Sequence, residues 1–167
     1  MCHWRICVIS LKTNNWIINN IETILFDKDG TFIDLHYFWG KMTELRAENV
    51  INHFDMNKDM FSKLCLFLGY NVVTKKMLSD GITALYSRPK IIDIFCQNLQ
   101  DCGITTNHKE IEEIFDKVNK IFYADMQKYT KPIDNAIDFI KKVHSLGIKC
   151  GIVTSDSKES TMMTLEH

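Results

Sequence analysis

Neither sign of charge predominates in this sequence, which has 20 Lys and Arg residues against 21 Asp and Glu residues. Proteins that bind nucleic acid or anionic membranes usually present an excess of basic residues or a polybasic tract. We therefore expect no nucleic-acid partner and no membrane partner. No hydrophobic run approaches the length of a membrane span, and the segment from Met1 to Leu11 lacks the pattern of a cleavable signal. A cytoplasmic location is expected.

Cysteine pairs at metal-binding spacing are also missing. The six cysteines form no Cys-x-x-Cys pair, and no pair of histidines stands at zinc-finger spacing from two of them. The group of Cys2, His3 and Cys7 is interpreted as incidental, and we expect free thiols in a reducing compartment.

The composition is typical of a globular protein, with 46% hydrophobic and 25% charged residues in 167. The first clear element is a β-prone run over residues 21–26, which stops at an acidic segment beginning with Asp27. Residues 1–20 contain turn signals around an apolar stretch. They predict either an additional edge strand or a poorly ordered extension.

Between residues 35 and 131 the apolar residues recur at helical spacing, which predicts a helical module with an apolar core. Pro89 suits the first turn of one helix, and Asn107 with Glu110 predicts a capping box at the start of another. Lys41 and Arg46 are interpreted as a solvated helix face.

After Pro132 the pattern changes to that of an α/β protein. Asp134 is a candidate cap for a helix that ends at Gly147, and a second strand is predicted over residues 148–153. Thr154 follows this strand directly. Ligands of open parallel sheets bind beyond the carboxyl ends of strands, so the segments that begin at Asp27 and Thr154 are expected to share one crevice.

Two other interpretations compete for the acidic segment. Asp-Gly is a common hairpin signal, so Asp29 and Gly30 could form a plain turn with solvated acids. A calcium-binding loop of the EF-hand type would need carboxylates at the positions of Leu25 and His36, and neither residue supplies one. A calcium-binding module is therefore disfavoured.

The run from Ile24 to Thr31 resembles the first motif of the haloacid dehalogenase superfamily, in which an apolar strand leads into D-x-D-G-T. The segment from Lys131 to Ser155 is similar to the helix, strand and hydroxyl residue of the second motif. The resemblance implies an α/β fold with a Rossmann-like parallel sheet core that is incomplete at its C-terminus. Residues 21–34 and 132–167 would form this core, and residues 35–131 an inserted helical cap.

The resemblance also implies a chemistry. Asp27 would be the nucleophile that forms an aspartyl-phosphate, and Asp29 the general acid and base. Mg²⁺ would be held by the Asp27 carboxylate and the Asp29 backbone carbonyl, while Thr154, Ser155 and Gly30 would bind the phosphate. An acid at position 29 favours phosphate-ester hydrolysis over dehalogenation. The implied substrate is a small phosphorylated metabolite.

In members of the superfamily a lysine and an acidic pair follow the second motif, and the chain ends at His167 before either. Asp156 and Glu159 are instead interpreted as a helix cap and its partner. We therefore expect weak activity in this chain and self-association through an exposed sheet edge. A non-catalytic regulatory module and, in a longer form, a phosphomutase-type phosphotransferase are the alternative functions.

Overall fold

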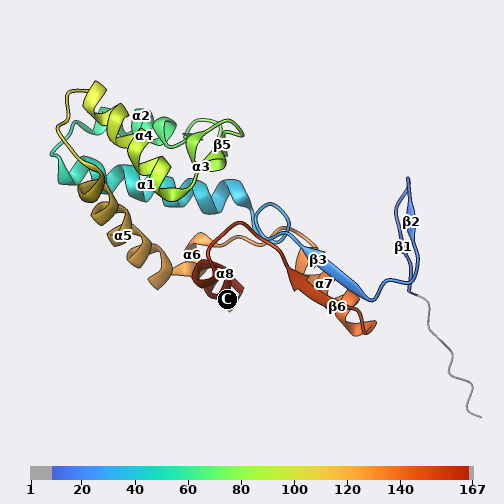
Figure 1. The fold of residues 1–167 in the computed structure, drawn as a ribbon. Coiled ribbons are helices and arrows are strands. Elements are labelled where there is room, and N and C mark those ends of the chain that lie inside the picture. The colour runs from blue at the N-terminus through green and yellow to red at the C-terminus, as the bar shows by residue number, and fades with distance from the viewer. Residues whose placement is uncertain (1–8, 166–167) are drawn as a thin grey trace, which may run out of the picture. The chain divides into compact units, whose positions relative to one another are not determined.

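The chain divides into two units in the computed structural model, which describes residues 9–165 (Figure 1). The first, named here the α/β unit, runs to Ile33 and resumes over Pro132–Asp156. The second, the helical unit, consists of Asp34–Lys131 and the segment that begins at Ser157.

A parallel pair of strands forms the sheet of the α/β unit. Strand β3 (Thr23–Phe26) pairs with β6 (Lys149–Ile152), with Thr23 opposite Lys149 and Phe26 opposite Ile152. Both strands are shorter than the predicted runs over residues 21–26 and 148–153, but their parallel pairing confirms the predicted α/β class. Among the described residues, β3 pairs with no other strand than β6.

Helix α7 (Ala136–Ser145) precedes β6 and packs on the sheet, where the Phe139 ring meets the Phe26 ring edge-on at 6.2 Å. The prediction that Asp134 caps this helix is wrong. The N-cap position is held by Asn135 in the left-handed conformation, with φ of 64°, because the chain turns sharply between Ile133 and Ala136.

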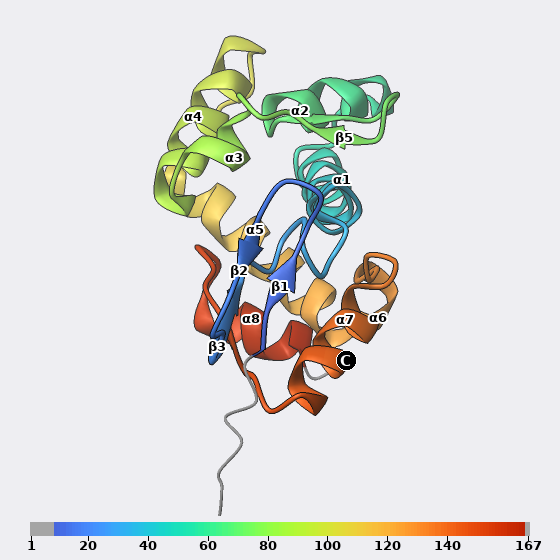
Figure 2. The same ribbon diagram turned by 90° about the vertical axis from the view of Figure 1, so that its right-hand side faces the viewer.

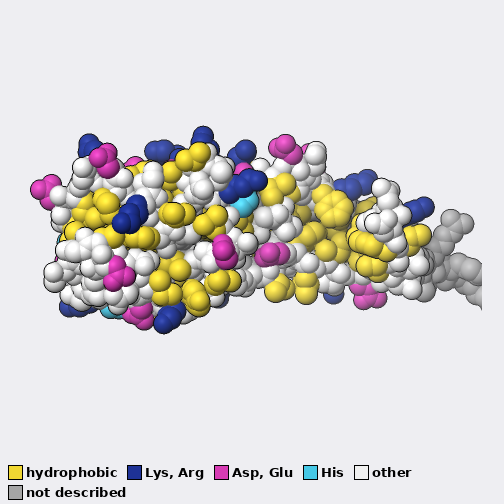
Figure 3. Space-filling view, turned by 90° about the horizontal axis from the view of Figure 1, so that it is seen from above, with side chains coloured by type: hydrophobic (Ala, Val, Ile, Leu, Met, Phe, Trp, Pro, Cys, Tyr) yellow, Lys and Arg dark blue, Asp and Glu magenta, His cyan; other side chains and the backbone are white. Residues whose placement is uncertain are grey.

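Figure 3 shows hydrophobic side chains, in yellow, on the surface of this unit toward the right of the view. Its exposed large apolar residues include Leu25, Ile137, Phe139, Leu146 and Val153. Self-association stays a prediction.

Residues 9–20 do not add an edge strand to the β3–β6 sheet. Strands β1 (Leu11–Lys12) and β2 (Ile17–Ile18) pair with each other in an antiparallel hairpin that is separate from the β3–β6 sheet. The Thr13 hydroxyl accepts hydrogen bonds from the backbone N–H groups of Asn15 and Trp16, which closes the turn locally. The first eight residues of the predicted N-terminal extension lie outside the described residues.

The helical unit is built around its longest helices. In Figure 2, α1 is seen nearly end-on with α2 beside it. Its helices are α1 (Leu35–His53), η1 (Lys58–Met60), α2 (Phe61–Phe67), α3 (Ile82–Leu85), α4 (Arg88–Asp101), α5 (His108–Ala124), α6 (Met126–Tyr129) and α8 (Lys158–Leu165). A short antiparallel pair, β4 (Tyr70–Asn71) and β5 (Lys76–Met77), follows α2. No helix within residues 9–165 has both the length and the apolar character needed to cross a membrane.

Pro89 and Asn107 lie at the starts of helices, as the sequence predicted. Pro89 lies in the first turn of α4, and the Asn107 side chain accepts a hydrogen bond from the Glu110 backbone N–H at 3.1 Å. The Glu110 carboxylate pairs with His53 and accepts hydrogen bonds from Thr106 and from the Asn107 backbone N–H, the last of which completes the predicted capping box. The hydrogen bond with His53 is the largest cause that lowers the pKa of Glu110.

The interpretation of Arg46 as part of a solvated helix face on α1 is wrong. Only 6% of Arg46 is exposed, and its guanidinium lies 4.4 Å from the centroid of the Phe115 ring. Lys41 does reach solvent, and its ammonium pairs with Glu44 at 2.6 Å.

Candidate active site

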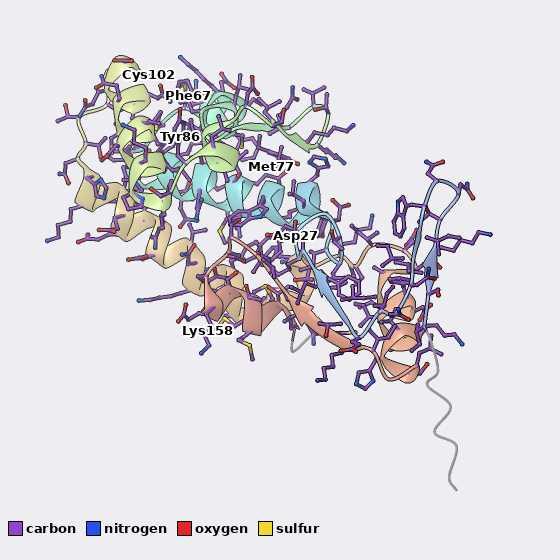
Figure 4. All side chains as sticks on the ribbon, turned by 45° about the vertical axis from the view of Figure 1, so that its right-hand side comes forward. Asp27, Phe67, Met77, Tyr86, Cys102 and Lys158 are labelled. Carbon is purple, nitrogen blue, oxygen red and sulfur yellow. The ribbon has the colours of Figure 1, made fainter. Side chains whose placement is uncertain are left out.

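The carboxyl ends of the two parallel strands bring the first two sequence motifs to one edge of the sheet. The Val153 backbone N–H donates to the Phe26 carbonyl at 2.8 Å, so the pairing continues to the last residue before each motif. Asp27 and Thr154 come next on neighbouring strands, and Figure 4 labels Asp27 where β3 ends. A ligand at this edge can be reached from both segments.

A tight turn follows Asp27 and places Asp29. The Lys28 carbonyl accepts the backbone N–H of Phe32 at 2.9 Å, and the Gly30 N–H donates to the Ile33 carbonyl at 2.8 Å. Gly30 has a φ of 84°, which a side chain would disfavour, so glycine suits the bend at this position. The turn holds the Asp29 side chain, 15% exposed, at the start of the loop.

Lys28 is completely buried and contacts three carboxylates. Its ammonium donates to Asp29 Oδ1 at 2.7 Å and lies 3.0 Å from Asp156 Oδ2. Its backbone N–H donates to Asp27 Oδ1 at 2.7 Å. One residue thus orients the carboxylates of Asp27 and Asp29 and ties the loop after β3 to the loop after β6.

The interpretation of Asp156 and Glu159 as a capping pair is wrong. The Asp156 side chain is 9% exposed and its carboxylate pairs with Lys28. At the start of α8, the Ser160 backbone N–H donates to Ser157 Oγ at 3.1 Å, which is the kind of bond expected of a cap.

A family model described as haloacid dehalogenase-like hydrolase matches residues 24–167. The chain belongs to this family. The match covers both motifs that resembled the superfamily in the sequence, and it supports a hydrolase. A comparison with curated proteins gives no match.

The predicted site residues of this haloacid dehalogenase-like hydrolase differ in their surroundings. Asp27, Gly30 and Ser155 are exposed, whereas Thr154 is half-buried and its hydroxyl accepts the backbone N–H of Asp156 at 3.2 Å. A hydroxyl that accepts one hydrogen bond still has its own proton to donate. Thr154 is therefore able to donate to an oxygen of a ligand at this edge.

The oxygen atoms of Asp27 and Asp29 suit a hard cation such as Mg²⁺. Mg²⁺ is usually bound by one or two carboxylates, several waters and the substrate phosphate, so a protein site needs few ligands of its own. Among residues 9–165, no group of three or more His, Cys, Asp or Glu side chains is placed to hold a metal. The donor set of this family member fits Mg²⁺ that is shared with a phosphate.

Sequence reasoning missed Lys28 and Asp156 as members of this site. Lys28 occupies the variable position of the first motif, and nothing in its neighbours indicates burial. Asp156 could have been found from its place in the sequence. It is an acidic residue two positions after Thr154, and it therefore also follows the end of a strand.

Proposed function

We propose that this protein is a phosphatase that hydrolyses a phosphate monoester of a small metabolite through an aspartyl-phosphate on Asp27. The observation that carries the proposal is the exposed carboxylate of Asp27, held by a backbone N–H at the end of β3 beside the strand end that carries Thr154. Phosphoryl transfer needs such a positioned nucleophile and donors for the phosphoryl oxygens. Release of inorganic phosphate from a panel of phosphorylated sugars, acids and nucleosides tests the proposal, and no release from any of them would oppose it.

The first chemical step belongs to Asp27. One oxygen of its carboxylate accepts the Lys28 N–H at 2.7 Å, which fixes the plane of the group and leaves the other oxygen for attack. As the new O–P bond forms, the bond between phosphorus and the leaving oxygen breaks, and Asp29, which enters this step in its protonated form, gives that oxygen its proton. Thr154 donates a hydrogen bond to a phosphoryl oxygen while charge builds up.

The second step regenerates the enzyme. Asp29, now a carboxylate, takes a proton from the water that attacks phosphorus, and the O–P bond to Asp27 breaks to release phosphate. The salt bridge with Lys28 holds Asp29 in one orientation for both proton transfers.

Mg²⁺ bound by the Asp27 carboxylate and the Asp29 carbonyl would offset the repulsion between an anionic nucleophile and an anionic phosphate. We expect phosphate release to require Mg²⁺ and to stop when Ca²⁺ replaces it. Ca²⁺ accepts more ligands and longer bonds, so it would compete for the Asp27 oxygen that has to attack phosphorus. The measurement is phosphate release after chelator treatment and addition of each ion. Full activity in excess chelator would contradict this expectation.

Asp29→Asn should lower turnover in a way that depends on the leaving group. Asn cannot deliver a proton, so alkyl phosphates, whose leaving oxygen is basic, should lose about 10²–10⁴-fold in rate. A nitrophenyl phosphate needs little protonation and should lose less in the first step. Comparing the loss in kcat/KM for the two substrates, which reports the first step and not the hydrolysis of the intermediate, gives the answer. Equal losses for both would remove Asp29 from the acid role.

A further inference from the structure

Arg46 of α1 carries a buried positive charge. Its guanidinium stacks over the Phe115 ring of α5, and its Nε atom is buried without a hydrogen bond. Within residues 9–165, no ion pair or hydrogen bond reaches this side chain. An unpaired charge is among the least favourable groups to bury, and an aromatic face offsets only part of that cost.

The two helices around Arg46 run antiparallel. At one end of the pair, His53 of α1 meets Glu110 of α5 at 2.9 Å. Toward the other end, the Tyr37 hydroxyl donates to the Lys128 carbonyl, just after α5, at 3.1 Å. Residues of α1 that precede Arg46 therefore lie beside residues of α5 that follow Phe115.

Two neutral polar groups in this part of the helix pair also find no hydrogen-bond partner in the described part of the chain. Thr43 Oγ1, one turn before Arg46, and Asn119 Oδ1, one turn after Phe115, are buried without hydrogen bonds. Tyr123, one turn further along α5, interacts electrostatically with Arg46, so Asn119 lies between two residues that are close to the guanidinium. The unpaired atoms thus lie within one helical turn of Arg46 on α1 or of Phe115 on α5.

The local charge is positive. Arg88 is near enough to Arg46 to disfavour its charge, and the Asp116 carboxylate, which pairs with Arg88 at 2.5 Å, is half-exposed. Burial first and Arg88 second lower the pKa of Arg46 to about 10, and the group that raises it among the described residues is Tyr123, not a carboxylate. At neutral pH the guanidinium remains charged, so the need for an anion remains.

We propose that Arg46 is the anchor of an oxyanion-binding site in the helical unit, which takes the carboxylate or phosphate group of a small molecule. The planar guanidinium matches both groups. The Thr43 hydroxyl has a proton to donate, and the Asn119 amide presents an N–H once it is turned by 180°. Buried water alone would satisfy the hydroxyl and the amide but would leave the charge of Arg46 uncompensated.

Thermal unfolding of the full chain tests the site without using activity. In Mg²⁺-free chloride buffer, Arg46→Met should melt at a higher temperature than the wild type, because it removes a charge that has no partner. Inorganic phosphate or acetate at constant ionic strength should raise the wild-type melting temperature by about 3–8 °C at saturation and leave Arg46→Met unchanged. A larger effect of phosphate would identify a phosphate ligand, and a larger effect of acetate would identify a carboxylate ligand.

Lys63→Met on α2 is the matched control. It removes the same charge and a similar cation–ring contact, 5.5 Å from the Phe67 centroid, at an exposed position. It should leave the anion response intact. A lower melting temperature or a failure to fold for Arg46→Met, or an equal anion response in both proteins, would overturn the proposal. Arg46→Lys keeps the charge but loses the planar fork, and a response undiminished in this variant would also overturn it.

Discussion

Asp27→Asn should reduce phosphate release by about 10⁴-fold or more while the fold is retained. The amide is nearly isosteric with the carboxylate, and its carbonyl oxygen can still accept the Lys28 N–H that now bonds Asp27 at 2.7 Å. The amide is a poor nucleophile toward phosphorus, so neither the covalent intermediate nor free phosphate should form. Steady-state phosphate release measures the loss, and mass spectrometry of quenched enzyme detects the aspartyl-phosphate.

Asp138→Asn is the control for this variant. Asp138 is exposed in the first turn of α7, so the control makes the same substitution in the same unit, away from the strand ends. Its rate should match that of the wild type. Covalent phosphorylation of Asp27→Asn at the wild-type level would exclude Asp27 as the nucleophile.

The parallel sheet edge was predictable because its signals are local. An apolar β-prone run that stops at Asp27, and another that stops at Thr154, each place a polar residue at a strand end without reference to the rest of the chain. The order of the elements then favours a parallel arrangement, which the β3–β6 register confirms. Gly30 was predictable for the same reason, since a positive φ in a tight turn favours glycine at one position.

The environment of Lys28 was not predictable, because it depends on two loops that are far apart in the chain. Next to two aspartates, a lysine is expected at the surface. Its burial follows from the turn at Gly30 together with the position of Asp156 after β6. Neither the turn at Gly30 nor the loop after β6 indicates the salt bridge by itself. The Asp156 carboxylate was therefore predicted to cap a helix.

Arg46 shows the limit of helical periodicity. The apolar stripe of α1 predicts which face is buried, but the stripe is broad, and a long polar side chain at its margin is equally compatible with solvent. Contact with Phe115 depends on how α5 packs against α1. The prediction of Asp134 as the cap of α7 failed because Asp and Asn are both good N-caps and the backbone turn places Asn135 at that position.

Lys28→Met should lower the free energy of unfolding by about 3 kcal/mol, because removing one partner of a buried ion pair leaves the other partner's charge uncompensated. Here two carboxylates would remain, since Asp29 and Asp156 both contact the ammonium and their side chains are 15% and 9% exposed. For a chain of this size, the loss corresponds to a fall in melting temperature of about 6–12 °C. Urea titration and thermal unfolding at neutral pH measure it.

Lys149→Met, at an exposed position of β6, removes the same charge in the same unit and should change stability by no more than about 0.5 kcal/mol. A second comparison separates charge from packing. Adding Asp29→Asn and Asp156→Asn to Lys28→Met removes the repelling carboxylates and should restore much of the lost stability, because no charge is then left without a partner. If the triple variant is no more stable than Lys28→Met, the aliphatic part of Lys28, and not its ammonium, holds the two loops together.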